Sequence, residues 1–277
     1  MTGYRVRIVT DDRDAVRFVR SLGVSCGGMP SRAQIAILDT YRRPEVRARL
    51  LRRVADRVVA IDDLHQISRR DVELILRPSI GERSGRATLG GARFVLLRRE
   101  YWRSHPRTIS REVRQVVIAL GSGAGRTILG RAAMSLSAAL PHARISVVTA
   151  EDLKLVGDAG ARVRTVGLVP SLAPLLRRAD IALTAAGQTL YESLASGTPT
   201  LVIGTADNQR RNVAAMRRSG AATVVGWLGD ARWNDHLAFR AARLAASVDD
   251  RRRLSRRGRA LVDGKGAPRV ARLIGEL

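Results

Sequence analysis

Residues 116–140 read VVIALGSGAGRTILGRAAMSLSAAL, which is an apolar run, a glycine-rich turn and an amphipathic segment in succession. The first five residues, Val116–Leu120, carry no polar side chain, and this indicates a strand buried on both faces of a sheet. From Thr127 to Leu140 the apolar residues recur at helical spacing. A buried strand followed by a helix predicts one β–α unit of a parallel sheet.

The same alternation runs along most of the 277 residues, and it predicts an α/β protein of two doubly wound, Rossmann-like domains. The pattern is interrupted at Pro78–Arg93 and at Arg103–Gln115, and we place the domain boundary in the second stretch, giving domains 1–108 and 109–277. The remaining predicted strands are Val6–Thr10, Ile35–Asp39, Val58–Asp62, Ile145–Thr149, Ile181–Ala185, Thr200–Ile203 and Ala222–Val225.

The chain is strongly basic, with 49 Lys and Arg against 25 Asp and Glu and a formal charge of +24. Such a charge favours a polyanionic partner, but Lys occurs only at 154 and 265, and the Arg residues are spread over predicted helices. We therefore expect a solvated Arg-rich surface and disfavour nucleic-acid binding. Cys26 is the single cysteine, no metal-ligand spacing is present, and neither a signal peptide nor a membrane span is evident, so we expect a cytoplasmic protein.

The turn Gly121-Ser122-Gly123-Ala124-Gly125 connects a strand to a helix, where backbone N–H groups and the helix dipole favour an anion such as phosphate. Its glycine spacing matches neither the Walker A loop nor the dinucleotide-binding fingerprint. The alternative is a turn that uses glycine only for tight packing.

Two further turns follow strands in the C-terminal half. In the first, Gly187-Gln188-Thr189 opens a helix carrying Glu192; Thr189 suits phosphate and Glu192 a sugar diol, the alternative being simple helix capping. In the second, residues 204–212 hold Asn208, Gln209, Arg210, Arg211 and Asn212, which suit sugar hydroxyls and a diphosphate. The alternative there is an Asn-nucleated turn before a solvated helix.

In the N-terminal half, Asp39 and Tyr41 follow one predicted strand, and Asp62, Asp63 and His65 follow another. These side chains are candidates to orient a substrate or carry a proton, whereas Asp residues at strand ends are more often caps or turn formers. His65 is a weaker candidate base because the sequence shows no partner that would orient it.

The ordered set of motifs resembles nucleotide-sugar enzymes of the glycosyltransferase-B architecture, in particular the UDP-sugar hydrolases of the pseudaminic acid pathway, grouped with spore-coat polysaccharide biosynthesis proteins. The resemblance spans nearly the whole chain. Its motifs are Leu38–Tyr41, Ile61–Leu64, Leu96–Tyr101, Ala179–Glu192, Gly197–Pro199, Ala206–Gln209 and Asp263–Ala267 with Arg269-Val270.

The resemblance implies a nucleotide-binding C-terminal domain and a sugar- or acceptor-side N-terminal domain. By it, Gly121, Ser122, Gly123, Gly187, Gln188 and Thr189 hold the diphosphate, Glu192 the ribose, and Asn208 and Gln209 the sugar. Asp39 and Tyr41 are implied near the anomeric carbon or the leaving phosphate. With Asp63 from the residue analysis, they complete the candidate catalytic set.

One departure separates this sequence from the family, which begins with a strand, a glycine-rich loop bearing the catalytic His, and a helix. Here Met1-Thr2-Gly3 leads directly into Tyr4–Thr10, the counterpart of the family's second strand. Either the start codon is assigned too late, or the base is lost and binding survives without turnover. Without that unit, we expect an uncovered sheet edge or apolar face near Val6–Val9.

We therefore expect a UDP-sugar hydrolase of surface-polysaccharide or nonulosonic acid biosynthesis, in which water attacks and UDP leaves without a metal or cofactor. Two alternatives stand beside it. One is a glycosyltransferase that uses a UDP-sugar donor, and the other is a nucleotide-sugar-binding protein with an incomplete catalytic site.

Overall fold

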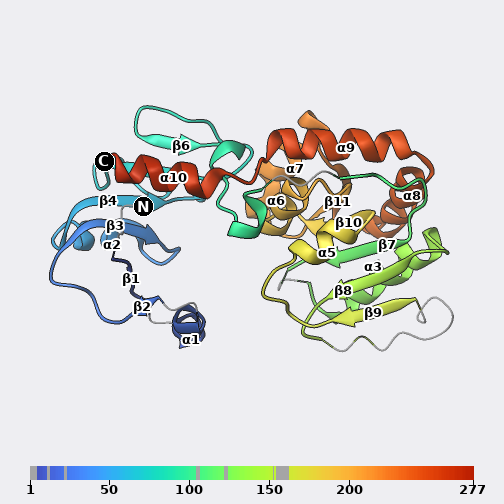
Figure 1. The fold of residues 1–277 in the computed structure, drawn as a ribbon, viewed down its shortest axis with the longest axis horizontal. Helices are drawn as coiled ribbons and strands as arrows, with labels where there is room; N and C mark the ends of the chain where they lie inside the picture. The colour runs from blue at the N-terminus through green and yellow to red at the C-terminus, as the bar shows by residue number, and fades with distance from the viewer. Residues whose placement is uncertain are drawn as a thin grey trace. The chain divides into compact units, whose positions relative to one another are not determined.

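The computed structural model describes residues 5–10, 13–21, 24–103, 107–121, 124–151, 153 and 162–277 (Figure 1). The chain divides into two compact units: unit 1 comprises Met1–Ala60 and Gln66–Leu74, and unit 2 comprises Ile61–His65 and Ile75–Leu277. The predicted domain boundary between residues 108 and 109 falls within unit 2, and it stays a prediction.

Unit 1 is built from two strand–helix–strand segments. Strands β1 and β2 are parallel, with Arg7 opposite Ser25, whereas β3 and β4 are neighbours in a different sheet. Pro44 occupies the first turn of α2, where its missing N–H is no loss. The elements are β1 (Arg7–Ile8), α1 (Arg13–Ser21), β2 (Ser25–Cys26), β3 (Ala33–Asp39), α2 (Pro44–Leu51) and β4 (Ala55–Ile61).

Large apolar side chains remain exposed in unit 1. Val6 and Val9, beside β1, are 58% and 43% exposed, and this confirms the expected uncovered apolar surface near them. Ile37 on β3 and Val46 and Leu50 on α2 are also about half exposed or more. β3 is an end strand of its sheet, so unit 1 presents both an open strand edge and uncovered apolar side chains.

Unit 2 contains a six-stranded sheet in the order β12-β11-β10-β7-β8-β9, with every neighbouring pair parallel. The chain runs outward from β7 to β9 on one side and from β10 to β12 on the other. The reversal point of the doubly wound sheet therefore lies between β7 and β10. The strands are β7 (Gln115–Ala119), β8 (Arg144–Val148), β9 (Val163–Val166), β10 (Ile181–Ala185), β11 (Thr200–Gly204) and β12 (Thr223–Trp227).

Helices cover both faces of this sheet (Figure 1). Alternate strand residues such as Ile118 and Leu183 pack with α3 and α8, whereas Ala182 and Val202 pack with α5, α6 and α7. The α/β fold with parallel sheets is thus confirmed. The described helices of unit 2 are α3 (Arg126–Ala139), α5 (Ala173–Arg178), α6 (Gln188–Ala195), α7 (Arg210–Ser219), α8 (Trp233–Ala246), α9 (Val248–Leu261) and α10 (Gly266–Gly275).

The remaining elements of unit 2 are two short strands and three 3-10 turns among the described residues. β5 (Leu74–Arg77), whose first residue belongs to unit 1, is parallel to β6 (Thr88–Gly90). Two short 3-10 turns follow, η1 (Ala92–Phe94) and η2 (Arg99–Tyr101), and a third, η3 (Asp207–Gln209), precedes α7. Each predicted strand overlaps an observed one, but β2, β5, β6 and β9, of two to four residues each, were not predicted. Such short strands carry too few residues to show a period.

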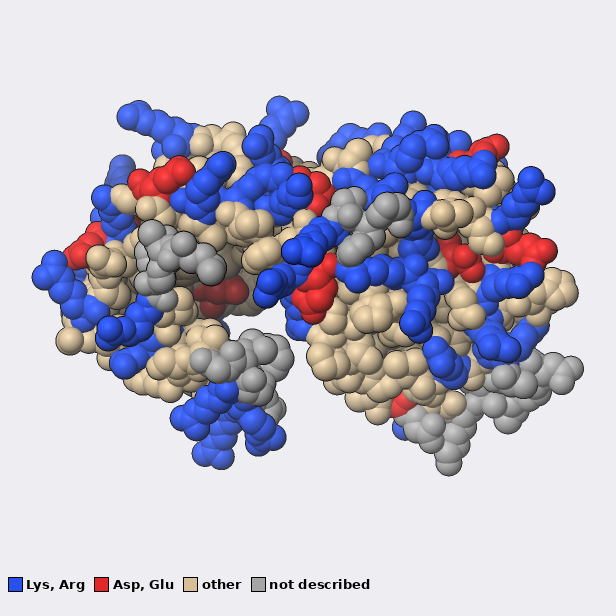
Figure 2. Space-filling model, viewed as in Figure 1, with Lys and Arg blue, Asp and Glu red and all other residues tan. Residues whose placement is uncertain are grey.

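Much of the Arg excess is exposed, and Figure 2 shows Lys and Arg spread over the visible face with acidic residues among them. Other Arg residues are buried or half-buried and donate hydrogen bonds to backbone carbonyls. The fully buried Arg251 donates to Leu244 O at 2.9 Å and to Ser110 O at 2.8 Å, and Arg107 donates to Leu176 O at 3.1 Å. These guanidiniums satisfy the open carbonyls at the ends of α8 and α5.

Candidate functional site

The turns after β7 and β10 lie at the reversal point of the sheet, because these two strands are neighbours. In open α/β sheets, this is where the carboxyl ends of the strands leave a crevice for ligands. The structure therefore brings together the two predicted phosphate turns, which are about 65 residues apart in sequence. Ser122 and Gly123 lie outside the described residues.

Both helices that start here have an N-terminus without a side-chain cap. α3 is preceded by Gly125 and α6 by Gly187, neither of which can cap through a side chain. A Cβ added at Gly121 or Gly125 would meet no atom within 4 Å, so the space beside these glycines is open. Gly121 also adopts a φ of 75°, which favours glycine. The first-turn N–H groups are thus available to an anion.

The turn between β10 and α6 is clamped by two amide side chains. Gln209 Oε1 accepts hydrogen bonds from Ala186 N at 3.2 Å and from Thr205 N at 3.0 Å. Asn212 Nδ2 donates to Ala186 O at 2.8 Å. The N–H and the C=O of Ala186 are therefore both hydrogen-bonded by side chains of the η3–α7 segment. Gln209 stabilises this turn, a role that the sequence analysis, which assigned it to the sugar, did not include.

The other predicted binding residues are placed by the same elements. Gln188, the first residue of α6, donates from Nε2 to Leu96 O at 2.7 Å, so its amide is engaged with the chain before η2. Thr189 is half-buried in the first turn of α6, and Asn208 is exposed in η3. Arg126 opens α3 and pairs with Glu151 at 3.3 Å.

Glu192 lies half-buried on α6, two turns from the clamped Ala186. Burial raises the pKa of its carboxyl to about 7, with the positive charge of Arg98 opposing and the negative charge of Glu100 adding to the rise. Tyr101, which is buried, also interacts with Glu192, and its own pKa is raised, first by burial and then by the Glu192 charge. Burial thus dominates the raised pKa of Glu192, and Arg98, Glu100 and Tyr101 modify it.

The predicted residues of the N-terminal half fall in both units. Asp39 and Tyr41 belong to unit 1, where both are exposed at and beyond the end of β3. Asp62 and Asp63 belong to unit 2. Asp62 is buried and paired with Arg77 at 3.1 Å, which fits a structural role.

Asp63 is exposed, and its negative charge contributes to the raised pKa of Tyr191 on α6, whose leading cause is burial. The Tyr191 hydroxyl donates to Ser79 Oγ at 3.4 Å, and Ser79 donates to Asn212 Oδ1 at 2.8 Å. Ser79 was not predicted, because it lies in the glycine-rich stretch 78–93 that showed no regular period. Through this chain of hydrogen bonds, the loop after β5 reaches the same amide clamp.

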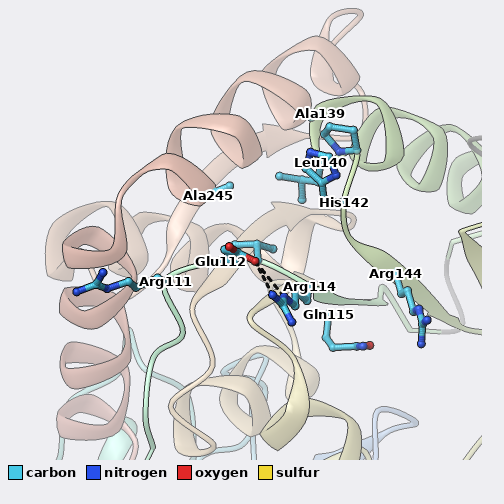
Figure 3. Close-up of a pocket in the computed structure, with 11 residues that line it drawn as sticks. Arg111, Glu112, Arg114, Gln115, Ala139, Leu140, His142, Arg144 and Ala245 are labelled. Atoms are coloured by element: carbon cyan, nitrogen blue, oxygen red, sulfur yellow. Dashed lines mark hydrogen bonds and ion pairs between the residues drawn. The ribbon is translucent and has the colours of Figure 1, made fainter.

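A cavity of about 890 Å³ lies at the opposite edge of the sheet, where β7 and β8 begin (Figure 3). Its lining includes Arg111, His142 and Arg144, together with Glu112 and Arg114, which form an ion pair at 2.8 Å. Ligands of open α/β sheets bind at the carboxyl ends of the strands, so we place the candidate site at the other edge. The described residues contain no group of three or more His, Cys, Asp or Glu arranged to hold a metal ion. Within the same residues, no helix has the length and apolar character needed to cross a membrane.

No family model matches the chain. A stretch of 106 residues is 35% identical to the spore coat polysaccharide biosynthesis protein SpsG of Bacillus subtilis (strain 168). This match covers 38% of the present chain and 31% of SpsG, so it spans under a third of that protein.

Solved structures match over nearly the whole chain. The glycotransferase of kitacinnamycin has a TM-score of 0.66 at 17% identity, covering 98% of this chain and 92% of that one. The spinosyn rhamnosyltransferase SpnG, complexed with thymidine diphosphate, has a TM-score of 0.56 at 17% identity, covering 94% and 76%. These likenesses establish the architecture, and the chain has the glycosyltransferase-B fold.

Proposed function

We propose that this protein transfers a glycosyl group from a nucleoside-diphosphate sugar, in the synthesis of a surface polysaccharide. The observation that carries the proposal is the pair of uncapped helix N-termini at the reversal point, with open space beside Gly121 and Gly125. Two such N-termini place several N–H donors and two positive dipole ends at one site, which suits a diphosphate.

In this proposal, the first turns of α3 and α6 bind the diphosphate, and Thr189 adds a hydroxyl donor. Glu192 accepts hydrogen bonds from the ribose diol when it is ionised. The glycosyl C–O bond breaks, the electron pair leaves with the nucleoside diphosphate, and the helix N-termini stabilise the charge that develops on it. Asp39, Tyr41, Asp63 and Asn208 remain candidates for the sugar and its nucleophile.

Transfer and hydrolysis differ only in the nucleophile, which is a hydroxyl group of the acceptor in transfer and water in hydrolysis. Transfer is our first proposal, because the matched structures are described as a glycotransferase and a rhamnosyltransferase. The likeness to SpsG supports a role in polysaccharide biosynthesis. Hydrolysis is the second, supported by the ordered motifs that resemble UDP-sugar hydrolases. The fold alone does not choose between them, because one architecture hosts different reactions.

The binding proposal is tested by placing a carboxylate at the N-terminus of α3. Gly125 has a φ of −70° and a ψ of 170°, which any residue adopts at an N-cap, and a Cβ there has free space. We expect Gly125→Asp to keep or slightly raise stability while weakening UDP binding about 10-fold or more, through like-charge repulsion. Calorimetry with UDP and TDP measures the affinity.

Gly125→Asn is the matched control, because it caps the helix with a neutral side chain of the same size. Its affinity should fall less than that of the Asp variant. Equal affinities for wild type and Gly125→Asp would contradict a phosphate site at α3. Product analysis with UDP-sugars, with and without sugar acceptors, then separates transfer from hydrolysis, and UDP release that needs an acceptor supports transfer.

A further inference from the structure

His65 follows β4 in a strained backbone conformation. Its φ is 60°, and Arg43 is the one other non-glycine residue with a positive φ in the described part of the chain. The left-handed region costs an L-residue about 1–2 kcal/mol, so the surrounding contacts must hold it. Strain of this kind is concentrated at functional sites, and this directs attention to the partners of His65.

Glu82 is the partner that the sequence did not reveal. His65 Nε2 lies 3.0 Å from Glu82 Oε1, and Arg211 Nη1 donates to the same oxygen at 2.6 Å. The Glu82 side chain is only 12% exposed. Burial alone would raise the pKa of Glu82, but the hydrogen bonds and charges of His65 and Arg211 hold that pKa below its ordinary value. Glu82 is therefore an ionised, fixed acceptor at neutral pH.

This arrangement leaves one imidazole nitrogen for chemistry. Nε2 contacts both Glu82 Oε1, an acceptor, and Arg211 Nη1, which can only donate. Because Arg211 Nη1 donates to Glu82 Oε1, we assign the tautomer in which Nε2–H also donates to Glu82, and this leaves the lone pair on Nδ1 as the basic atom. The His65 side chain is 32% exposed, so water or a hydroxyl can reach it. The other charged groups of the surroundings are Arg211, which also contacts the ring, Asp63 in the same loop, and the Asp62–Arg77 pair.

The His65–Glu82 pair is tied to the candidate donor site through α7. Arg211 is followed directly by Asn212, whose amide holds Ala186 at the turn before α6. The loop that carries Glu82 also carries Ser79, the hydrogen-bond donor to Asn212 Oδ1. A Cβ at Gly81 would lie 3.1 Å from Arg211 Cβ, so this loop packs closely on the start of α7. One helical turn thus positions both His65 and the phosphate turn.

We infer that His65, oriented by Glu82, is the general base of the glycosyl transfer proposed above, and the inference rests on that proposed function. As the nucleophile oxygen bonds to the anomeric carbon, its proton passes to Nδ1 of His65. The bond between that carbon and the diphosphate oxygen breaks, and the electron pair leaves with the nucleoside diphosphate. Glu82 is a positioning residue that holds the tautomer and balances the imidazolium charge.

The test replaces His65 by residues that tolerate its backbone. Asn adopts the left-handed region more readily than most residues, and Gly does so without strain, so His65→Asn and His65→Gly should fold. We expect both to bind UDP as the wild type does and to release UDP from the donor sugar about 100- to 10,000-fold more slowly. His236→Gln, at an exposed position of α8, is the control and should keep the wild-type rate.

Glu82→Gln and Glu82→Asp test the positioning role through the split between turnover and binding. Glu82→Gln removes the carboxylate that orients the ring, so we expect kcat to fall while UDP affinity stays at the wild-type value, and Glu82→Asp, which keeps the carboxylate, should lose less. A merely structural role would weaken binding and turnover together in both variants. Equal losses of kcat in the two variants therefore overturn the role of Glu82.

The outcomes separate the base from the proposed function. If wild type and His65→Asn release UDP at nearly equal rates, the role of His65 as general base is overturned and the transfer proposal stands. Wild type that binds UDP-sugars but releases no UDP, with water or with acceptors, overturns both catalytic claims and leaves binding. No heat with UDP or TDP overturns the nucleotide site and the base together.

Discussion

The two edges of the six-stranded sheet differ in how their polar backbone groups are satisfied. At the amino edge, Asp180 accepts from the N–H groups of Arg114 and Gln115, and the guanidiniums of Arg107 and Arg251 occupy nearby carbonyls. At the carboxyl edge, the N-termini of α3 and α6 have no side-chain cap. The amino edge has the 890 Å³ cavity, but the carboxyl edge has the available donors. The proposed site therefore rests on the available donors of the carboxyl edge and not on cavity size.

The largest expected effect lies outside the candidate site, at Arg251. Its guanidinium binds four carbonyl oxygens, of Leu244, Ala245, Ser110 and Arg111, and its side chain is fully buried. We expect Arg251→Met to lower the free energy of unfolding by about 3–5 kcal/mol, because buried carbonyls lose their donors. Urea denaturation measures this loss. UDP affinity of the folded variant should be unchanged, and a parallel loss of affinity would break the contrast between the edges.

In contrast to Arg251→Met, substitutions in the amide clamp formed by Gln209 and Asn212 should weaken UDP binding. Asn212→Leu and Gln209→Leu remove the groups that hold Ala186, so the α6 N-terminus is no longer fixed for a diphosphate. We expect a stability loss of about 1–3 kcal/mol and a roughly 10- to 100-fold weaker UDP affinity, measured by calorimetry at a temperature where each variant is folded. Asn234→Leu, on α8, removes a surface amide that binds Arg131 and serves as the control. Wild-type affinity in both clamp variants would show that the clamp is irrelevant to binding.

Glu192 makes stability depend on pH at the carboxyl edge. The pKa of Glu192 is near the ordinary value of 4.5 in the unfolded chain and about 7 in the folded protein, so the folded state binds more protons between these pH values. Stability attributable to Glu192 must then fall as pH rises from about 4.5 to 7 and level off above. Glu192→Gln removes this dependence, and we expect it to be more stable than wild type at pH 8 by about 1–3 kcal/mol. Thermal unfolding at pH 5 and pH 8 measures the difference, and an equal pH dependence of the two proteins would refute it.

The same titration predicts a smaller, opposite effect on binding. Only the ionised carboxylate accepts two hydrogen bonds from a diol, so UDP affinity should rise a few-fold as pH increases from 6 to 8. The Glu192→Gln variant should lack that rise, and 2′-deoxyuridine diphosphate should show little of it with wild type. A rise of the same size for both nucleotides would remove Glu192 from the ribose site.

The sequence by itself determined the layered α/β architecture. Runs such as Val116–Leu120 and Ile181–Ala185 are apolar throughout and end in glycine turns, and burial on both faces of a parallel sheet is the arrangement that satisfies them. The positions of the two glycine-containing turns proposed to bind phosphate followed from the same pattern, because turn glycines and helix starts are local signals.

Only the tertiary structure decided how the polar side chains are used. The order of strands placed β7 beside β10, and packing directed the Gln209 oxygen to Ala186 N, although the sequence suited Gln209 equally to a sugar. Glu82 could not be identified from the sequence as the partner of His65, because the two residues are 17 positions apart and strand β5 lies between them. A side chain's hydrogen bond depends on which distant segments pack against it, and that information is absent from local periodicity.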